Sequence, residues 1–79
     1  MATIRFFAAA ADVVGASTLE RPVSTVGELR TSLETEFGLS AAKVIAQCSL
    51  LVNGRRVSDD THPLALADTV DVLPPFAGG

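Results

Sequence analysis

Residues 25–38 read TVGELRTSLETEFG, and this is the clearest helix pattern in the chain. Thr25 can cap the helix through its hydroxyl, and Glu28, three residues later, can reach back to complete a capping box. Apolar residues then recur at helical spacing and form one stripe, made of Val26, Leu29, Leu33 and Phe37. Gly38 is expected to end the helix, because glycine readily adopts the left-handed conformation found just after helices. The stretch therefore predicts one amphipathic helix with a single apolar face.

Short extended segments flank this helix in the sequence. Strands are predicted over residues 2–8, 18–23, 50–52, 55–57 and 69–73, and in residues 2–8 apolar and polar positions alternate as expected for a strand with one buried face. Asn53-Gly54 is a strong signal for a tight hairpin turn between the third and fourth of these strands. Short helical segments are expected over residues 9–14, ending at Gly15, and over residues 40–46.

The order of these elements predicts an α+β domain of the β-grasp, or ubiquitin-like, type. A mixed sheet would carry the main helix on one face, with the first and last strands paired in parallel at its centre. The predicted core combines the helix stripe with the inward strand positions: Ile4, Phe6, Val26, Leu29, Leu33, Phe37, Leu50, Val52, Val70 and Val72. The single Cys48 cannot form an internal disulfide, so the fold must depend on this core.

The charge balance excludes two functions that are common among small proteins. Six Lys and Arg residues against nine Asp and Glu residues give a net charge of −3. Only Arg55 and Arg56 are adjacent, which is too little for a nucleic-acid-binding or membrane-surface patch. No apolar run approaches the roughly 20 residues that span a bilayer, and no export signal is recognisable. We therefore expect a cytoplasmic protein that binds neither nucleic acid nor membranes.

Groups that could carry catalysis are scarce. His62 is the only histidine and precedes Pro63 in a predicted loop, without the partners that a catalytic triad needs. Cys48 precedes an apolar strand and is expected to be a small buried residue. The carboxylates lack the spacing of a metal site, and the chain has no glycine-rich phosphate loop. We therefore expect no tightly bound cofactor and no metal.

The last residues form the most informative segment of the chain. The final strand ends at Leu73, and a tail follows: Pro74, Pro75, Phe76, Ala77, Gly78 and Gly79. Proline lacks the backbone donor that a sheet requires, and two prolines favour an extended arm. We therefore divide the chain into a domain over residues 1–73 and a flexible, extended tail over residues 74–79. A terminal Gly-Gly without side-chain bulk can thread a narrow channel, which predicts the Gly79 carboxylate as the reactive group.

The chain resembles the small, sulfur-carrying subunit of molybdopterin synthase, within the ubiquitin-like sulfur carriers that include the thiamine-pathway carrier. The matching stretches are Phe6-Phe7-Ala8, Val14-Gly15, Thr25-Val26, Leu29-Arg30, Val52-Asn53, His62-Pro63-Leu64, Asp68-Thr69-Val70, Pro74-Pro75 and Gly78-Gly79. The Pro-Pro-x-x-Gly-Gly ending is the most specific and favours the molybdopterin branch. One departure is Leu66-Ala67-Asp68, where the family often has Asp-Gly-Asp; a left-handed Ala67 would cost about 1 kcal/mol.

The resemblance implies a carrier mechanism. A ubiquitin-activating-type adenylyltransferase would use Mg-ATP to adenylate Gly79, and a sulfurtransferase would supply sulfur for a C-terminal thiocarboxylate. The large subunit of molybdopterin synthase would then receive the tail, in an expected heterotetramer, and the sulfur would enter the pterin precursor. The carrier would be a sulfur-donating subunit without a catalytic acid or base of its own.

Three alternatives stay open at the level of the sequence. The chain could carry sulfur for cysteine, thiamine or another thiolated product; it could be a protein modifier that forms an isopeptide bond; or it could be an interaction module with an inert tail.

We also predict a partner interface. Because Ile4 and Phe6 point into the core, Phe7 must face the opposite side of the sheet, where it would meet Leu73, with Phe76 just beyond.

Overall fold

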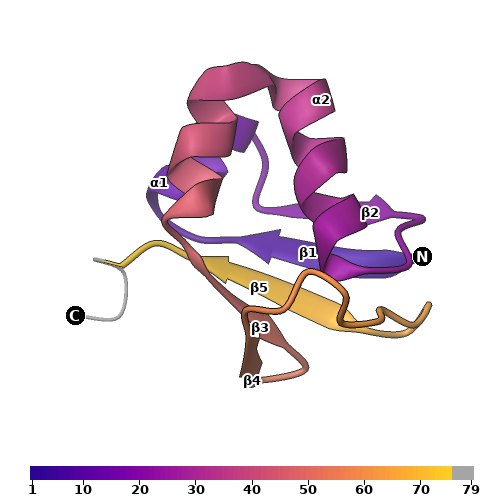
Figure 1. The fold of residues 1–79 in the computed structure, drawn as a ribbon. Coiled ribbons are helices and arrows are strands. Elements are labelled where there is room, and N and C mark those ends of the chain that lie inside the picture. The colour runs from indigo at the N-terminus through magenta and orange to yellow at the C-terminus, as the bar shows by residue number, and fades with distance from the viewer. Residues whose placement is uncertain (76–79) are drawn as a thin grey trace.

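The computed structural model of the chain describes residues 1–75, in which a mixed sheet carries its helices on one face (Figure 1). The strands are β1 (Ala2–Phe6), β2 (Thr18–Arg21), β3 (Ser49–Val52), β4 (Arg55–Val57) and β5 (Thr69–Leu73), and the helices are α1 (Ala9–Val14) and α2 (Val26–Ala46). Each predicted element is present. β1 ends two residues early, and β2 ends at Arg21, directly before Pro22, which lacks a backbone donor.

The sheet has the strand order β2-β1-β5-β3-β4. Strands β1 and β5 run parallel at its centre, with Ile4 opposite Val70 and Phe6 opposite Val72. The other three neighbouring pairs are antiparallel. The central parallel pair therefore has β2 on one side and the β3–β4 hairpin on the other, and α2 connects β2 to β3, which confirms the predicted β-grasp architecture.

Helix α2 has two halves. Gly38 has φ 87° and ψ −178°, a conformation that L-residues with a side chain rarely adopt, and it interrupts the helix at the predicted position. Figure 1 shows the first half rising away from the sheet and the second half returning toward it. The second half contributes Ala41 and Ile45, both buried, to the core.

The start of α2 is held by its own cap and by a distant loop. The hydroxyl of Thr25 accepts from the backbone N–H of Glu28 at 3.1 Å, which is the first half of the predicted capping box. The next two backbone N–H groups of the helix donate to carbonyl groups of the loop at residues 59–64. The N–H of Val26 donates to the carbonyl of His62 at 3.1 Å, and the N–H of Gly27 donates to the carbonyl of Asp60 at 2.9 Å.

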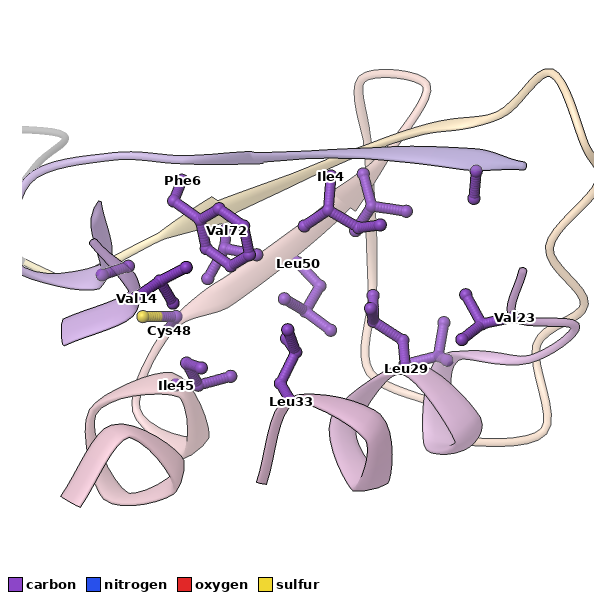
Figure 2. Close-up of a cluster of buried hydrophobic side chains, with 14 of the residues drawn as sticks. Ile4, Phe6, Val14, Val23, Leu29, Leu33, Ile45, Cys48, Leu50 and Val72 are labelled. Atoms are coloured by element: carbon purple, nitrogen blue, oxygen red, sulfur yellow. The ribbon is translucent and has the colours of Figure 1, made fainter. Parts of the chain in front are cut away.

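The core lies between the sheet and the helices (Figure 2). Inward residues of the strands meet Leu29 and Leu33 from the first half of α2, and Ile45 from the second half. All ten predicted core residues are buried except Phe37, which is only half-buried. Phe37 directly precedes Gly38, at the junction of the two halves of α2, and this junction lies far from the sheet (Figure 1). The helical spacing correctly predicted the face of the helix on which Phe37 lies. It could not show that this end of the first half of α2 is distant from the sheet.

No helix within residues 1–75 combines the length and the apolar character that crossing a membrane requires.

Candidate functional site

The chain leaves the sheet from its centre. Leu73, the last residue of β5, still pairs with Ser49 of β3, so the strand is held by neighbours up to its end. Pro74, the first residue of the predicted tail, is buried, and Pro75 is exposed. The remaining predicted site residues, Phe76, Ala77, Gly78 and the reactive Gly79, lie outside the described residues. Whatever follows Pro75 therefore starts from a fixed point on the central strand.

Phe7 lies next to this exit point. Its backbone N–H donates to the carbonyl of Val72 at 3.2 Å, which continues the β1–β5 ladder one residue beyond β1. Because Phe6 and Val72 face the helices, Phe7 and Leu73 occupy neighbouring positions on the opposite face of the sheet. Phe7 is 37% exposed, and Leu73 is half-buried. The structure thus brings together two of the three predicted interface residues.

An ion pair stands beside Phe7 on the same face. Arg5 and Asp71 are register partners, and the guanidinium donates twice to the carboxylate: Nε to Oδ1 at 2.6 Å and Nη2 to Oδ2 at 2.8 Å. The hydrogen bond and the charge of Asp71 raise the pKa of Arg5. The same guanidinium lies 5.8 Å from the centre of the Phe7 ring. An exposed pair contributes little stability, so its main effect is to fix a cation beside the ring.

The direction of Phe7 is set by an unusual turn. The N–H of Ala10 donates to the carbonyl of Phe7 at 3.1 Å, and Ala8 between them has φ 51° and ψ −126°. These angles belong to the first central position of a type II′ turn, where glycine is preferred. A residue with a side chain is strained there by about 1–3 kcal/mol. This strained turn ends β1 two residues before the predicted boundary and begins α1 at once.

The other sequence candidates do not form a reactive group. Cys48 is 8% exposed, and its thiol donates to the carbonyl of Val44 at 3.2 Å. Burial raises the pKa of the Cys48 thiol, so it stays protonated and unreactive at neutral pH. His62 is half-buried, and its backbone carbonyl serves the start of α2. Within residues 1–75, no three His, Cys, Asp or Glu side chains gather into a group that could hold a metal ion.

The turn at residues 66–68 is not strained in the way that its sequence suggested. The residues other than glycine with positive φ in the described part are Ala8 and Asn53, so Ala67 is not left-handed. Asp68 shapes the turn instead, because its carboxylate accepts from the N–H of Ala65 and from the amide of Asn53, both at 2.8 Å. These two hydrogen bonds, the backbone one first, lower the pKa of Asp68. The side chain of Asn53 in turn accepts from the N–H of Thr69 at 2.9 Å.

This sheet order, with a helix crossover between central parallel strands, defines a ubiquitin-like β-grasp protein. Among solved structures, SAMP1 from Haloferax volcanii matches with a TM-score of 0.78 and 24% identity, over 99% of this chain and 98% of that chain. The HVO 2177 protein of Haloferax volcanii matches with a TM-score of 0.74 and 32% identity, over 99% of this chain and 85% of that chain. A third match is to the complex of subunits 1 and 2 of molybdopterin-converting factor from Helicobacter pylori, with a TM-score of 0.75, 24% identity and coverage of 99% and 97%.

The chain belongs to the ThiS family, whose model matches residues 4–79. A comparison with curated proteins found no match. Fold and family together make the chain a ubiquitin-like protein of the sulfur-carrier type, as the resemblance in the sequence implied.

Proposed function

We propose that this protein is a sulfur carrier whose Gly79 carboxylate is converted to a thiocarboxylate. The observation that carries the proposal is the continuity from the central strand β5 through Pro74-Pro75 to a terminal Gly-Gly, inside a family match that extends to residue 79. A rigid domain would present the tail, and the tail would carry the chemistry.

The chemistry needs no acid or base from the carrier. In the first step, an oxygen of the Gly79 carboxylate attacks the α-phosphorus of Mg-ATP on an activating enzyme of the ubiquitin-activating type, and pyrophosphate leaves. In the second step, the outer sulfur of a persulfide on a sulfurtransferase attacks the acyl-adenylate carbonyl and displaces AMP. A second thiol then cleaves the resulting acyl disulfide, which leaves a disulfide on the donor and the thiocarboxylate on Gly79. Glycine suits both steps, because it adopts almost any backbone conformation and places no side chain beside the carbonyl.

The sulfur acceptor that we propose is the pterin precursor of the molybdenum cofactor. The thiocarboxylated chain would act as the small subunit of molybdopterin synthase. Its tail would insert into a large subunit that provides proton transfer. The Pro-Pro-x-x-Gly-Gly ending supports this choice, and so does the Helicobacter pylori neighbour, which forms a complex with a second subunit of its converting factor.

The open face of the sheet gives this function a docking surface. Phe7 and Leu73 lie at the point where the tail departs, next to the Arg5–Asp71 pair. An exposed aromatic residue beside a fixed cation is typical of interface centres. A partner that covers this surface would aim the tail into its own active site. The activating enzyme and the large subunit would therefore compete for one surface and bind in turn.

Intact mass spectrometry tests the carrier chemistry. After co-expression with an activating enzyme and a sulfur source, we expect a mass increase equal to the replacement of one oxygen by sulfur. Deleting Gly79, or adding one residue after it, should abolish the increase while the circular-dichroism spectrum stays unchanged. Thiocarboxylate formation in the Gly79-deleted chain would contradict the assignment.

The acceptor is tested by adding a large synthase subunit and the pterin precursor to the thiocarboxylated chain. Loss of the added sulfur with formation of a dithiolene supports the molybdopterin function. If the chain keeps its sulfur in that reaction but transfers it to a cysteine or thiamine precursor in a parallel reaction, the chain serves another pathway. A shift of target proteins to higher mass on a gel would instead indicate isopeptide bonds, as the name of the neighbour SAMP1, a small archaeal modifier protein, suggests for that protein.

The docking surface is tested separately with Phe7→Ala and Leu73→Ala, using calorimetric titration against each partner. Truncating residues near an interface centre typically costs about 1–4 kcal/mol of binding free energy. Leu66→Ala is the matched control, because Leu66 is 76% exposed and lies outside β1 and β5, the strands at the docking surface. If Phe7→Ala and Leu73→Ala bind each partner as tightly as Leu66→Ala does, this surface is not the docking surface.

A further inference from the structure

A second candidate site lies at the far edge of the sheet, on β4. A cavity of about 350 Å³ opens between β4 and the loop that follows it. Its apolar lining comes from Val52 and Val57, and its polar lining includes Arg55, Arg56 and His62. The docking surface described above involves β1 and β5, so this cavity is separate from it. A volume of this size accommodates a side chain of a partner or a small ligand.

The edge of β4 offers free backbone groups next to this cavity. Among the described strands, β4 pairs with β3 alone. The connecting turn is two residues long, with φ 51° at Asn53 and 85° at Gly54, so the flanking residues Val52 and Arg55 exchange both of their hydrogen bonds. Alternation along an antiparallel pair then turns the N–H and C=O of Arg56 outward. The edge can therefore accept one more strand.

The two arginine side chains on β4 differ from the other described arginines in their ion pairing. Arg5, Arg21 and Arg30 each form an ion pair with a carboxylate. Within residues 1–75, Arg55 and Arg56 form no ion pair, and both are exposed. Two adjacent cations are thus left uncompensated in a chain whose net charge is −3. Asp59 also lines the cavity, but its Oδ1 accepts from the N–H and the hydroxyl of Thr61 at 2.9 and 2.7 Å, and it forms no ion pair with either arginine.

We propose that β4 and its cavity bind an acidic, extended segment of a partner protein by strand addition. The backbone of that segment pairs with Arg56, one apolar side chain enters the cavity over Val52 and Val57, and the carboxylates on the opposite face of the segment meet Arg56. A second copy of this chain fits poorly, because pairing two β4 edges would bring four arginine side chains together. A small anion would use the arginines but neither the apolar lining nor the backbone edge. The inference is independent of the chemistry at Gly79.

The experiment follows backbone amides of the full-length chain by NMR. The probe is an acetylated, amidated heptapeptide of alternating Glu and Val, and the comparison peptide has Lys in place of Glu. We expect the acidic peptide to shift the amide signals of residues 55–58 and 62 and to slow hydrogen exchange at the Arg56 N–H. We expect no binding of the Lys peptide. Inorganic phosphate that reproduces the shifts without slowed exchange would replace the proposal with a simple anion site.

Matched variants separate charge from backbone pairing. Arg56→Gln should weaken binding about two- to fivefold, as expected for one exposed ion pair. Arg56→Pro also removes the outward N–H and should weaken binding about two- to tenfold further, the effect of one hydrogen bond. Because this N–H does not pair with β3, the proline should leave the hairpin folded. Lys43→Gln removes one exposed charge on α2 and should leave binding unchanged. Equal affinities of Arg56→Gln and Arg56→Pro would overturn strand addition, as would failure of the acidic peptide to bind or its failure to slow exchange at Arg56.

Discussion

Replacing Leu33 by alanine tests how α2 packs on the sheet. Leu33 is 1% exposed and belongs to the set of largest fully buried side chains. Figure 2 shows it between the sheet and the two halves of α2, directed toward Leu50. The side chain therefore joins the helix layer to the sheet layer, and removing it leaves a space that neither layer can fill without moving.

The expected loss of stability follows from this burial. The substitution removes three carbon groups, each worth about 0.8 kcal/mol of burial, or about 2.4 kcal/mol together. The cavity left behind adds to this, which brings the total to about 3–5 kcal/mol. A chain of 79 residues has a total stability of roughly 4–12 kcal/mol. Leu33→Ala should therefore remove a large part of the free energy of unfolding.

Urea denaturation followed by circular dichroism measures the effect, with thermal melting as a second readout. At about 4–8 °C per kcal/mol, the melting temperature should fall by more than about 10 °C. Leu39→Ala is the control, because it makes the same chemical change in α2 at a residue that is 65% exposed, and it should change stability by less than about 0.5 kcal/mol. Equal stabilities of the two variants would refute the packing described here.

Three further predictions concern the turns and the buried thiol. Ala8→Gly should stabilise the chain by about 1 kcal/mol because it relieves positive φ, whereas Ala9→Gly should destabilise it by up to about 1 kcal/mol; urea denaturation of both checks the opposite signs. Cys48 should react with a thiol reagent at least about tenfold more slowly in the native chain than in urea, and equal rates would contradict its burial. The pKa of Asp68 is lowered by folding from about 3.9, so its carboxylate stabilises the chain above about pH 4, and this stability is lost as the pH falls through the folded-state pKa. Asp68→Asn should therefore flatten the decline of stability on acidification, and a profile that keeps its full slope would show that this carboxylate contributes nothing.

Most of the fold could be predicted from short-range patterns in the sequence. The stripe of α2, the stop at Gly38 and the Asn53-Gly54 turn each depend on residues within a few positions of one another. The central pairing of the first and last strands followed because a parallel connection needs a crossover, and α2 is the one long helix within residues 1–75. Phe7 and Leu73 could be placed together for the same reason, since alternation and register are regular.

Features that depend on contacts between distant segments were not predictable in the same way. The loop at residues 59–64 supplies carbonyls to the start of α2, but nothing in its sequence indicates that partner. Ala8 adopts an angle that its own side chain disfavours, so local preference predicted a longer strand instead. The Arg5–Asp71 pair was accessible in principle, because both residues occupy outward positions of strands that were predicted to be neighbours.

The parallel pairing of β1 and β5 also determines how the molecule bears mechanical load. Suppose that a partner grips the tail while the N-terminus is held or pulled the other way. The force then runs in opposite directions along two adjacent strands, whose four registered pairs extend from Thr3 opposite Thr69 to Phe6 opposite Val72. In that geometry the interstrand hydrogen bonds are sheared together and do not open one after another, as they would when a hairpin is peeled apart from one end. The domain should therefore resist being pulled by its tail, and traction on a captured C-terminus would be transmitted to the whole domain before any strand is lost.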